Sequence, residues 1–250
     1  MSKIPLVLLI TFFISLQSVT AQRFEVGMGA GFTNYRGDLN PNFNPLTAMP
    51  AMNLMGRYNH SKSISLGLQA MGGFLHGADK LSRNPYNKTR DYEFKSSLIE
   101  MNARLEYNFN NFRFYDSYYR SDYSPILFGG IGGYVAPNSK YINDQGTVEE
   151  QGQINSPNYY ILGGVGYKRK ISDGFNISAE MGARVVFDKR YADDIDGLSF
   201  NNELSISNAY LQSSSVNNNN LIPNTTNKDY YFYTCISISY VFRGVRCPKR

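Results

Sequence analysis

Several features common in enzymes and in helical membrane proteins are scarce in this sequence. It has only two histidines, His60 and His76, and neither has a serine, cysteine or carboxylate at a spacing that marks a catalytic triad. No stretch after the N-terminal segment reaches the roughly 20 apolar residues that a membrane-spanning helix requires. The formal charge is +5, yet no stripe of lysine and arginine of the nucleic-acid-binding kind is present. We therefore predict a protein that is not an enzyme, with no cofactor, no nucleic-acid partner and no evident small-molecule substrate.

Two short motifs resemble binding loops without matching them. Asp193, Asp194 and Asp196 offer carboxylates, but their spacing is not that of a recognised calcium loop. The glycine run 129–133 is not followed by a helix or by a lysine placed for a phosphate. The sequence therefore predicts no metal site and no phosphate loop.

The N-terminus has the layout of a secretory signal peptide. A short positive start that includes Lys3 precedes an apolar core from Ile4 to Leu16, and the small residues around Ala21 provide a cleavage site before Gln22. We predict a signal peptide over residues 1–21 and an exported mature chain over residues 22–250. Gln22, and not a cysteine, directly follows the predicted cut, so a lipid-modified N-terminus is not indicated.

The mature chain has two cysteines, Cys235 and Cys247. Exported cysteine pairs often form disulfides. Here the seven residues from Cys235 to the end of its predicted strand span roughly 23 Å, whereas bridged α-carbons lie within about 7 Å. We therefore predict two unpaired thiols.

The clearest periodic stretch runs from Leu98 to Phe109. Apolar residues occupy the odd positions from Ile99 to Phe109, and Glu, Asn and Arg occupy the even positions between them. A period of two is typical of a β-strand with two unlike faces, and about 9 to 11 residues suffice for a tilted strand to cross a bilayer. This strand alone fits both a soluble sheet and a membrane barrel.

Seven further segments complete a set of eight predicted strands. Gly27, Gly29 and Gly31 share the polar face of the first, where glycine leaves room for large side chains from across a narrow barrel. The lipid-facing side of the glycine-rich strand at 125–136 is left unassigned. The other predicted strands are 23–39, 50–59, 63–77, 125–136, 159–168, 176–187 and about 230–242, with a tail over 243–250.

Two features favour the membrane barrel. Long connections alternate with tight turns, as when long loops lie outside the cell and short turns face the periplasm, and the connection 110–124 is the exception. The polar faces carry charges of both signs, which pair inside an eight-stranded barrel because side chains fill its interior. A lipocalin-like barrel has apolar interior positions instead. The predicted lumen charges are Glu25, Arg57, Glu100, Arg104, Glu106, Glu180 and Arg184.

The predicted fold class is therefore an all-β protein, an eight-stranded antiparallel transmembrane β-barrel with long extracellular loops. We expect it in the outer membrane of a Gram-negative bacterium, in contact with outer-membrane lipid. The paired charges predict a plugged barrel and not an open pore.

Four motifs support a resemblance that covers nearly all of the mature chain. They are Asn34-Tyr35-Arg36-Gly37-Asp38-Leu39, Ser124-Pro125-Ile126-Leu127-Phe128-Gly129-Gly130, Tyr191-Ala192-Asp193-Asp194-Ile195-Asp196-Gly197 and Arg246-Cys247-Pro248. Together they resemble the family of small outer-membrane β-barrels that includes PorG of the type IX (Por) secretion system. The third departs from the family pattern, with Ala192 and Asp196 where a bulkier apolar residue and a serine are usual.

The resemblance implies contacts with periplasmic secretion-ring proteins like PorK and PorN. The segments 110–124 and 243–250 offer enough periplasmic surface, and the first is rich in the residue types that dominate contact energies. A membrane-interface belt explains the same aromatics equally well. A barrel that binds an extracellular partner through its long loops is the alternative function. The predicted contact residues are Phe112, Arg113, Phe114, Tyr115, Tyr118, Tyr119, Arg120, Arg246 and Cys247.

Overall fold

The computed structural model describes residues 24–37, 45–81, 93–112, 121–136, 139–142, 148–151, 154–172, 174–187 and 230–242. Within them lie ten strands and two short 3-10 helices. The strands are β1 (Phe24–Arg36), β2 (Met49–Asn59), β3 (Ile64–Ala78), β4 (Glu93–Asn108), β5 (Tyr123–Ala136), β6 (Ser139–Ile142), β7 (Val148–Gln151), β8 (Ile154–Lys170), β9 (Phe175–Phe187) and β10 (Tyr230–Val241). The 3-10 helices are η3 (Pro45–Thr47) and η4 (Asp79–Leu81). None of the described helices is long and apolar enough to cross a bilayer.

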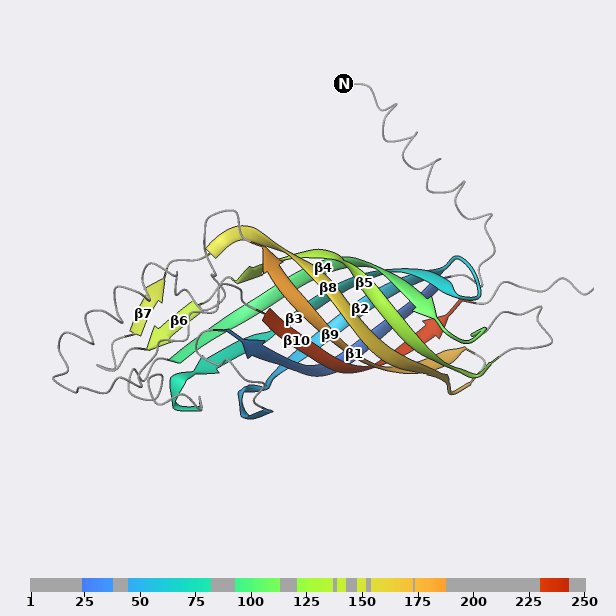
Figure 1. The fold of residues 1–250 in the computed structure, drawn as a ribbon, viewed down its shortest axis with the longest axis horizontal. Coiled ribbons are helices and arrows are strands. Elements are labelled where there is room, and N and C mark those ends of the chain that lie inside the picture. The colour runs from blue at the N-terminus through green and yellow to red at the C-terminus, as the bar shows by residue number, and fades with distance from the viewer. Residues whose placement is uncertain are drawn as a thin grey trace, which may run out of the picture.

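Eight of the strands close into a barrel (Figure 1). Their hydrogen-bonded order is β3-β2-β1-β10-β9-β8-β5-β4, and the pairing of β3 with β4 joins the two ends. Every pairing is antiparallel, including the twelve-residue seam between β1 and β10. The predicted eight-stranded antiparallel barrel is confirmed. Closure leaves no barrel strand with an open edge along its paired length.

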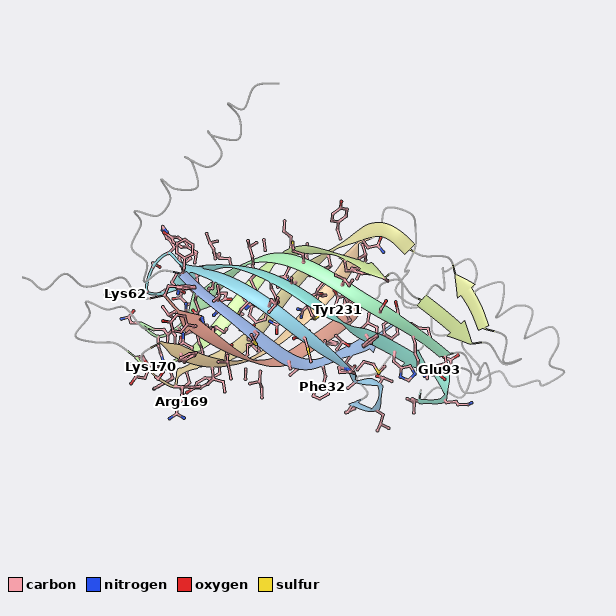
Figure 2. All side chains as sticks on the ribbon, turned by 180° about the vertical axis from the view of Figure 1, so that it is seen from behind. Phe32, Lys62, Glu93, Arg169, Lys170 and Tyr231 are labelled. Atoms are coloured by element: carbon pink, nitrogen blue, oxygen red, sulfur yellow. The ribbon has the colours of Figure 1, made fainter. Side chains whose placement is uncertain are left out.

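Two different ends result from this topology. The short connections 60–63 and 171–174 lie at one end, with the connection 109–122 between β4 and β5; we call this the turn end. The other connections leave from the opposite end, which we call the loop end. Figure 2 shows Lys62, Arg169 and Lys170 at the turn end and Phe32 and Glu93 toward the loop end.

Side chains alternate strictly between the two faces of the barrel wall because consecutive strand residues point to opposite sides. In β4, Met101 is 68% exposed while its neighbours Glu100 and Asn102 are buried. The same holds in β1, where Met28 is exposed and Glu25 is buried. The exterior is therefore apolar and the interior carries the charges, the reverse of a water-soluble barrel.

The structure shows which side of the glycine-rich strand β5 faces outward, a side that the sequence leaves unassigned. Leu127 and Ile131 point outward and are exposed, whereas Ile126, Phe128 and Tyr134 are buried in the lumen. Interior glycines make room for such residues. A Cβ on Gly132 would lie 2.5 Å from the hydroxyl oxygen of Tyr160 in β8.

The predicted strands leave residues 137–158 as a connection, and the structure corrects this. The segment contains the β6–β7 hairpin, and β8 begins at Ile154 rather than at residue 159. β4 also begins earlier, at Glu93, and its first residues pair with β6 beyond the end of β5. Figure 1 shows the hairpin beyond the barrel at the loop end.

Exposed aromatic residues surround the turn end. Phe24 contacts Tyr58, with ring centroids 5.1 Å apart, and Tyr123 stacks on Tyr167 at 6.1 Å. Interfacial rings of tyrosine and phenylalanine are typical of membrane barrels, because their amphipathic rings favour the headgroup level. The turn-end girdle comprises exposed Phe24, Tyr107, Phe109, Tyr123, Tyr167, Phe175, Tyr240 and Phe242 and half-buried Tyr58; exposed Phe32, Phe74 and Tyr159 lie toward the loop end.

Candidate functional site: the ion-paired lumen and the turn end

The half of the lumen near the turn end holds three carboxylates and three cations, which we call the turn-side cluster. Its members are Glu25, Glu106, Glu180, Arg57, Arg104 and Lys168, contributed by β1, β4, β9, β2, β4 and β8. All six are at most 5% exposed. The cluster therefore joins strands from every side of the barrel.

Arg57 is the centre of this cluster. Its guanidinium contacts Glu25 at 2.9 Å, Glu106 at 2.7 Å and Glu180 at 3.3 Å. Arg104 bridges Glu106 and Glu180, each at 2.8 Å. Because Arg presents several donors in one plane, a single side chain can serve three carboxylates.

Glu25 and Glu106 have further partners. Asn176 donates to Glu25 at 3.1 Å, and the hydroxyl of Ser239 also donates to this carboxylate. Lys168 donates to Glu106 at 3.3 Å. The carboxylates are thus held by hydrogen bonds as well as by opposite charge, which is the condition for burying ions without a large net cost.

A second ion pair lies nearer the loop end. Arg184 contacts Glu100 at 3.1 Å, and the Tyr231 hydroxyl donates to the same carboxylate. Tyr134, Tyr160 and Tyr231 contact one another with ring centroids 6.0 to 6.3 Å apart. Figure 2 marks Tyr231 between the two ends of the barrel.

Unlike the turn-end half, the loop-end half of the lumen is filled largely by aromatic and aliphatic side chains. Tyr35, Leu75, Phe94 and Leu98 are buried there, and Tyr35 meets Phe94 edge-on at 4.9 Å. The interior is therefore ionic near the turn end and aromatic and aliphatic near the loop end. Polarity of the lumen alone does not separate this barrel from ligand-binding barrels; the buried ion pairs and the outward apolar face do.

All seven sequence-predicted lumen charges lie inside the barrel and take part in ion pairs. Sequence reasoning missed Lys168, because the predicted strand ended at that residue. Its parity with Gly164 and Gly166 was the available signal, since these glycines face the lumen. With Lys168 the buried inward strand positions carry four carboxylates and four cations.

This charge balance leads to a prediction about conductance. Four buried carboxylates pair with four buried cations inside the described part of the barrel. An ion entering the lumen would therefore have to displace paired side chains. We expect the refolded protein in planar lipid bilayers to show no steady open-channel conductance at neutral pH. A stable conductance of porin size would contradict the plugged barrel.

The connection between β4 and β5 is anchored at the mouth of the barrel. Phe112 forms a β-bridge with Ser121, and the Ser121 N–H donates to the Asn111 carbonyl at 2.9 Å. The Lys168 ammonium lies 5.7 Å from the centre of the Phe112 ring, a cation–π arrangement. Of the predicted contact residues, Phe112 is thus half-buried against the lumen.

The other predicted contact residues lie outside the described residues. These are Arg113, Phe114, Tyr115, Tyr118, Tyr119, Arg120, Arg246 and Cys247, and the same holds for Asp193, Asp194 and Asp196. Cys235 is buried in the lumen wall and unpaired. Within the described ranges, no group of three or more His, Cys, Asp and Glu side chains is arranged to hold a metal ion.

The two histidines do not form part of a catalytic arrangement among the described residues. His76 lies 3.2 Å from Glu93, which also contacts Lys95 at 2.9 Å, and all three belong to the loop-end extensions of β3 and β4. His60 is exposed in the β2–β3 turn, with its ring 6.3 Å from that of Tyr58.

A closed eight-stranded barrel with an apolar exterior, a buried ion-pair network and exposed aromatic rings is an outer-membrane β-barrel, and it lies in the outer membrane in contact with lipid. The chain belongs to the family described as a domain of unknown function, DUF6089, whose model matches residues 4–248. None of the curated proteins compared with the chain matches it.

Solved structures of bacterial outer-membrane proteins are similar at low identity. Neisserial surface protein A shares 10% identity at a TM-score of 0.46, with 88% of this chain and 97% of that chain covered. Ail of Yersinia pestis, in complex with a heparin analogue, shares 10% at 0.43, covering 87% and 97%. The Escherichia coli outer membrane protease OmpT shares 11% at 0.36, covering 89% and 98%.

Proposed function

We propose that the protein is a non-enzymatic component of the type IX protein secretion machinery that contacts periplasmic ring proteins through its turn end. The supporting observation is the combination of a plugged lumen with an anchored connection at the turn end. Ion pairs occupy the described lumen, so transport through the barrel is not its role. Activity then resides at the ends.

The turn end offers a base for a protein contact. Tight turns follow β2 and β8 there, but the connection from β4 to β5 is held by the Phe112–Ser121 bridge and by Phe112 against Lys168. The sequence between these anchors contains four aromatic residues and two arginines. Aromatic residues and arginine are enriched at contact hot spots. The motif resemblance to PorG-like barrels supports PorK-like and PorN-like partners.

We expect replacement of four aromatics by serine to abolish copurification with the ring proteins. The residues are Phe114, Tyr115, Tyr118 and Tyr119, whereas Phe112 is kept because it packs at the barrel mouth. Affinity capture from detergent-solubilised envelopes followed by mass spectrometry provides the measurement. Heat-modifiable migration on gels verifies that the barrel still folds.

A matched control replaces Phe32 and Tyr159 by serine, since both are exposed aromatics toward the loop end. This control variant should retain the partners. Retention of the ring proteins by the four-serine variant would refute the turn-end contact. Normal secretion in cells that lack the whole protein would refute the secretion role itself.

The β6–β7 hairpin favours a second candidate function, binding of an extracellular partner at the loop end. The hairpin pairs with the first four residues of β4 and extends the β3–β4 sheet beyond the barrel. Deletion of residues 139–151 should then abolish capture of an external partner while leaving the ring proteins bound. Unchanged capture of the external partner after this deletion would refute the loop-end function.

A further inference from the structure

Arg169 is an exception on the exterior of the barrel. Outward positions along the described strands are almost all apolar or aromatic, and the other charged ones, such as Glu93 and Lys95, lie at the loop end. Arg169 occupies the outward face of β8 at the turn end, where it is exposed (Figure 2). A guanidinium at this level meets the headgroups of the facing lipid leaflet.

The residues around Arg169 leave its charge available. Its register partners are Tyr123 in β5 and Ile177 in β9, neither of which carries a carboxylate. Among the described residues of the turn end, Asp122 is the only acidic residue outside the lumen. Its carboxylate lies 4.0 Å from the Lys170 ammonium. No described acidic side chain therefore pairs with Arg169.

Two girdle tyrosines define the site further. Tyr167 precedes Arg169 by two residues on the same face, and its ring stacks on Tyr123 with an interplanar angle of 23°. Both rings are about half exposed. Stacked tyrosines place the site at the boundary between the hydrocarbon and the headgroups, where a phosphate is accessible to the guanidinium.

Toward the middle of the barrel from Arg169, the outer surface carries almost no side chain at one row of positions, which we call the low wall. Gly163 lies outward on β8, and its register partners are Gly129 in β5 and Ala183 in β9, so three adjacent strands present almost no side chain there. Arg169 lies six positions along the strand from Gly163, which is roughly 20 Å, or roughly half the thickness of the bilayer core once strand tilt is included. An acyl chain of ordinary length extends from the headgroup level to this row.

We propose that Arg169, Tyr123 and Tyr167 form a binding site for the phosphate of an anionic phospholipid, whose acyl chain lies against the low wall at Gly163. This Arg169 site is separate from the proposed protein contact, because it faces sideways into the bilayer. The site ties the barrel to the phospholipid leaflet at its turn end. The assignment rests on the opposite charges of Arg169 and the lipid phosphate, and on the outward position of Arg169 on β8.

Native mass spectrometry of the refolded mature chain tests the site. The chain is titrated with phosphatidylglycerol and, separately, with phosphatidylcholine of the same acyl chains. We expect about fivefold tighter binding of phosphatidylglycerol, the effect of one interfacial cation on an anionic lipid. Arg169→Gln should reduce this binding to the phosphatidylcholine level, whereas Lys95→Gln at the loop end should leave it unchanged.

Two further arms identify the source of the phosphate. Gly163→Phe, which fills open space, should weaken the binding of both lipids, and soluble glycerol 3-phosphate should not displace phosphatidylglycerol. Equal affinity for the two lipids, a preference that survives Arg169→Gln, or displacement by soluble glycerol 3-phosphate would each overturn the proposal. Heat-modifiable migration of every variant establishes that the barrel is folded.

Discussion

Replacing Arg57 by methionine should destabilise the folded barrel by about 3 to 5 kcal/mol, the usual cost of removing one partner from a buried ion pair. Arg57 contacts Glu25, Glu106 and Glu180. Methionine fills a similar volume but leaves these carboxylates with a net negative charge inside the wall. Arg104 and Lys168 compensate only part of it, because they are already engaged with Glu106 and Glu180.

Urea unfolding in detergent micelles, followed by heat-modifiable gel migration, measures this effect. The midpoint of the Arg57→Met variant should shift to markedly lower urea. Arg169→Gln is the matched control, since it also removes one arginine but from an exposed position without a described acidic partner. If Arg57→Met unfolds at the same urea concentration as the control, the network does not stabilise the barrel.

The stretches that cross the bilayer are the part of the fold that sequence periodicity predicts. There, lipid on one side and a polar lumen on the other impose strict alternation, as in β4 from residue 98 onward. The first residues of β4, such as Lys95 and Ser97, precede its pairing with β5, and outward residues in this loop-end part of the strand are not all apolar. For the same reason, no alternating apolar pattern in the sequence indicates β6, β7 or the first part of β8.

The composition of the lumen was predictable only in part for a related reason. Charged side chains on a membrane strand face the lumen because the lipid side excludes them, so parity alone places Glu100, Arg104 and Glu106 inside the barrel. Tyrosine and phenylalanine are favourable both in the lumen and at the interface. Tyr35 and Phe94, which fill the loop-end half, therefore gave no distinguishing signal, and their packing depends on which strands meet across the barrel.

Replacing Gly31 by valine should prevent closure of the barrel between β1 and β10. Gly31 faces the lumen opposite Cys235, and an added Cβ would meet the Thr234 carbonyl oxygen and lie 2.6 Å from the Cys235 α-carbon. These are backbone atoms, which move only if the strands separate. Gly56→Val is the matched control, because a Cβ at this outward glycine of β2 meets nothing within 4 Å.

We expect the Gly31→Val protein to lose most of its heat-modifiable folded band after refolding into detergent, while Gly56→Val refolds like the unsubstituted chain. Both changes raise β-propensity equally, so propensity does not explain a difference between them. The β1–β10 seam joins the first and last strands, and its pairing is required for a closed barrel. Equal refolding yields for the two variants would mean that β1 and β10 pair in another register or at a greater separation.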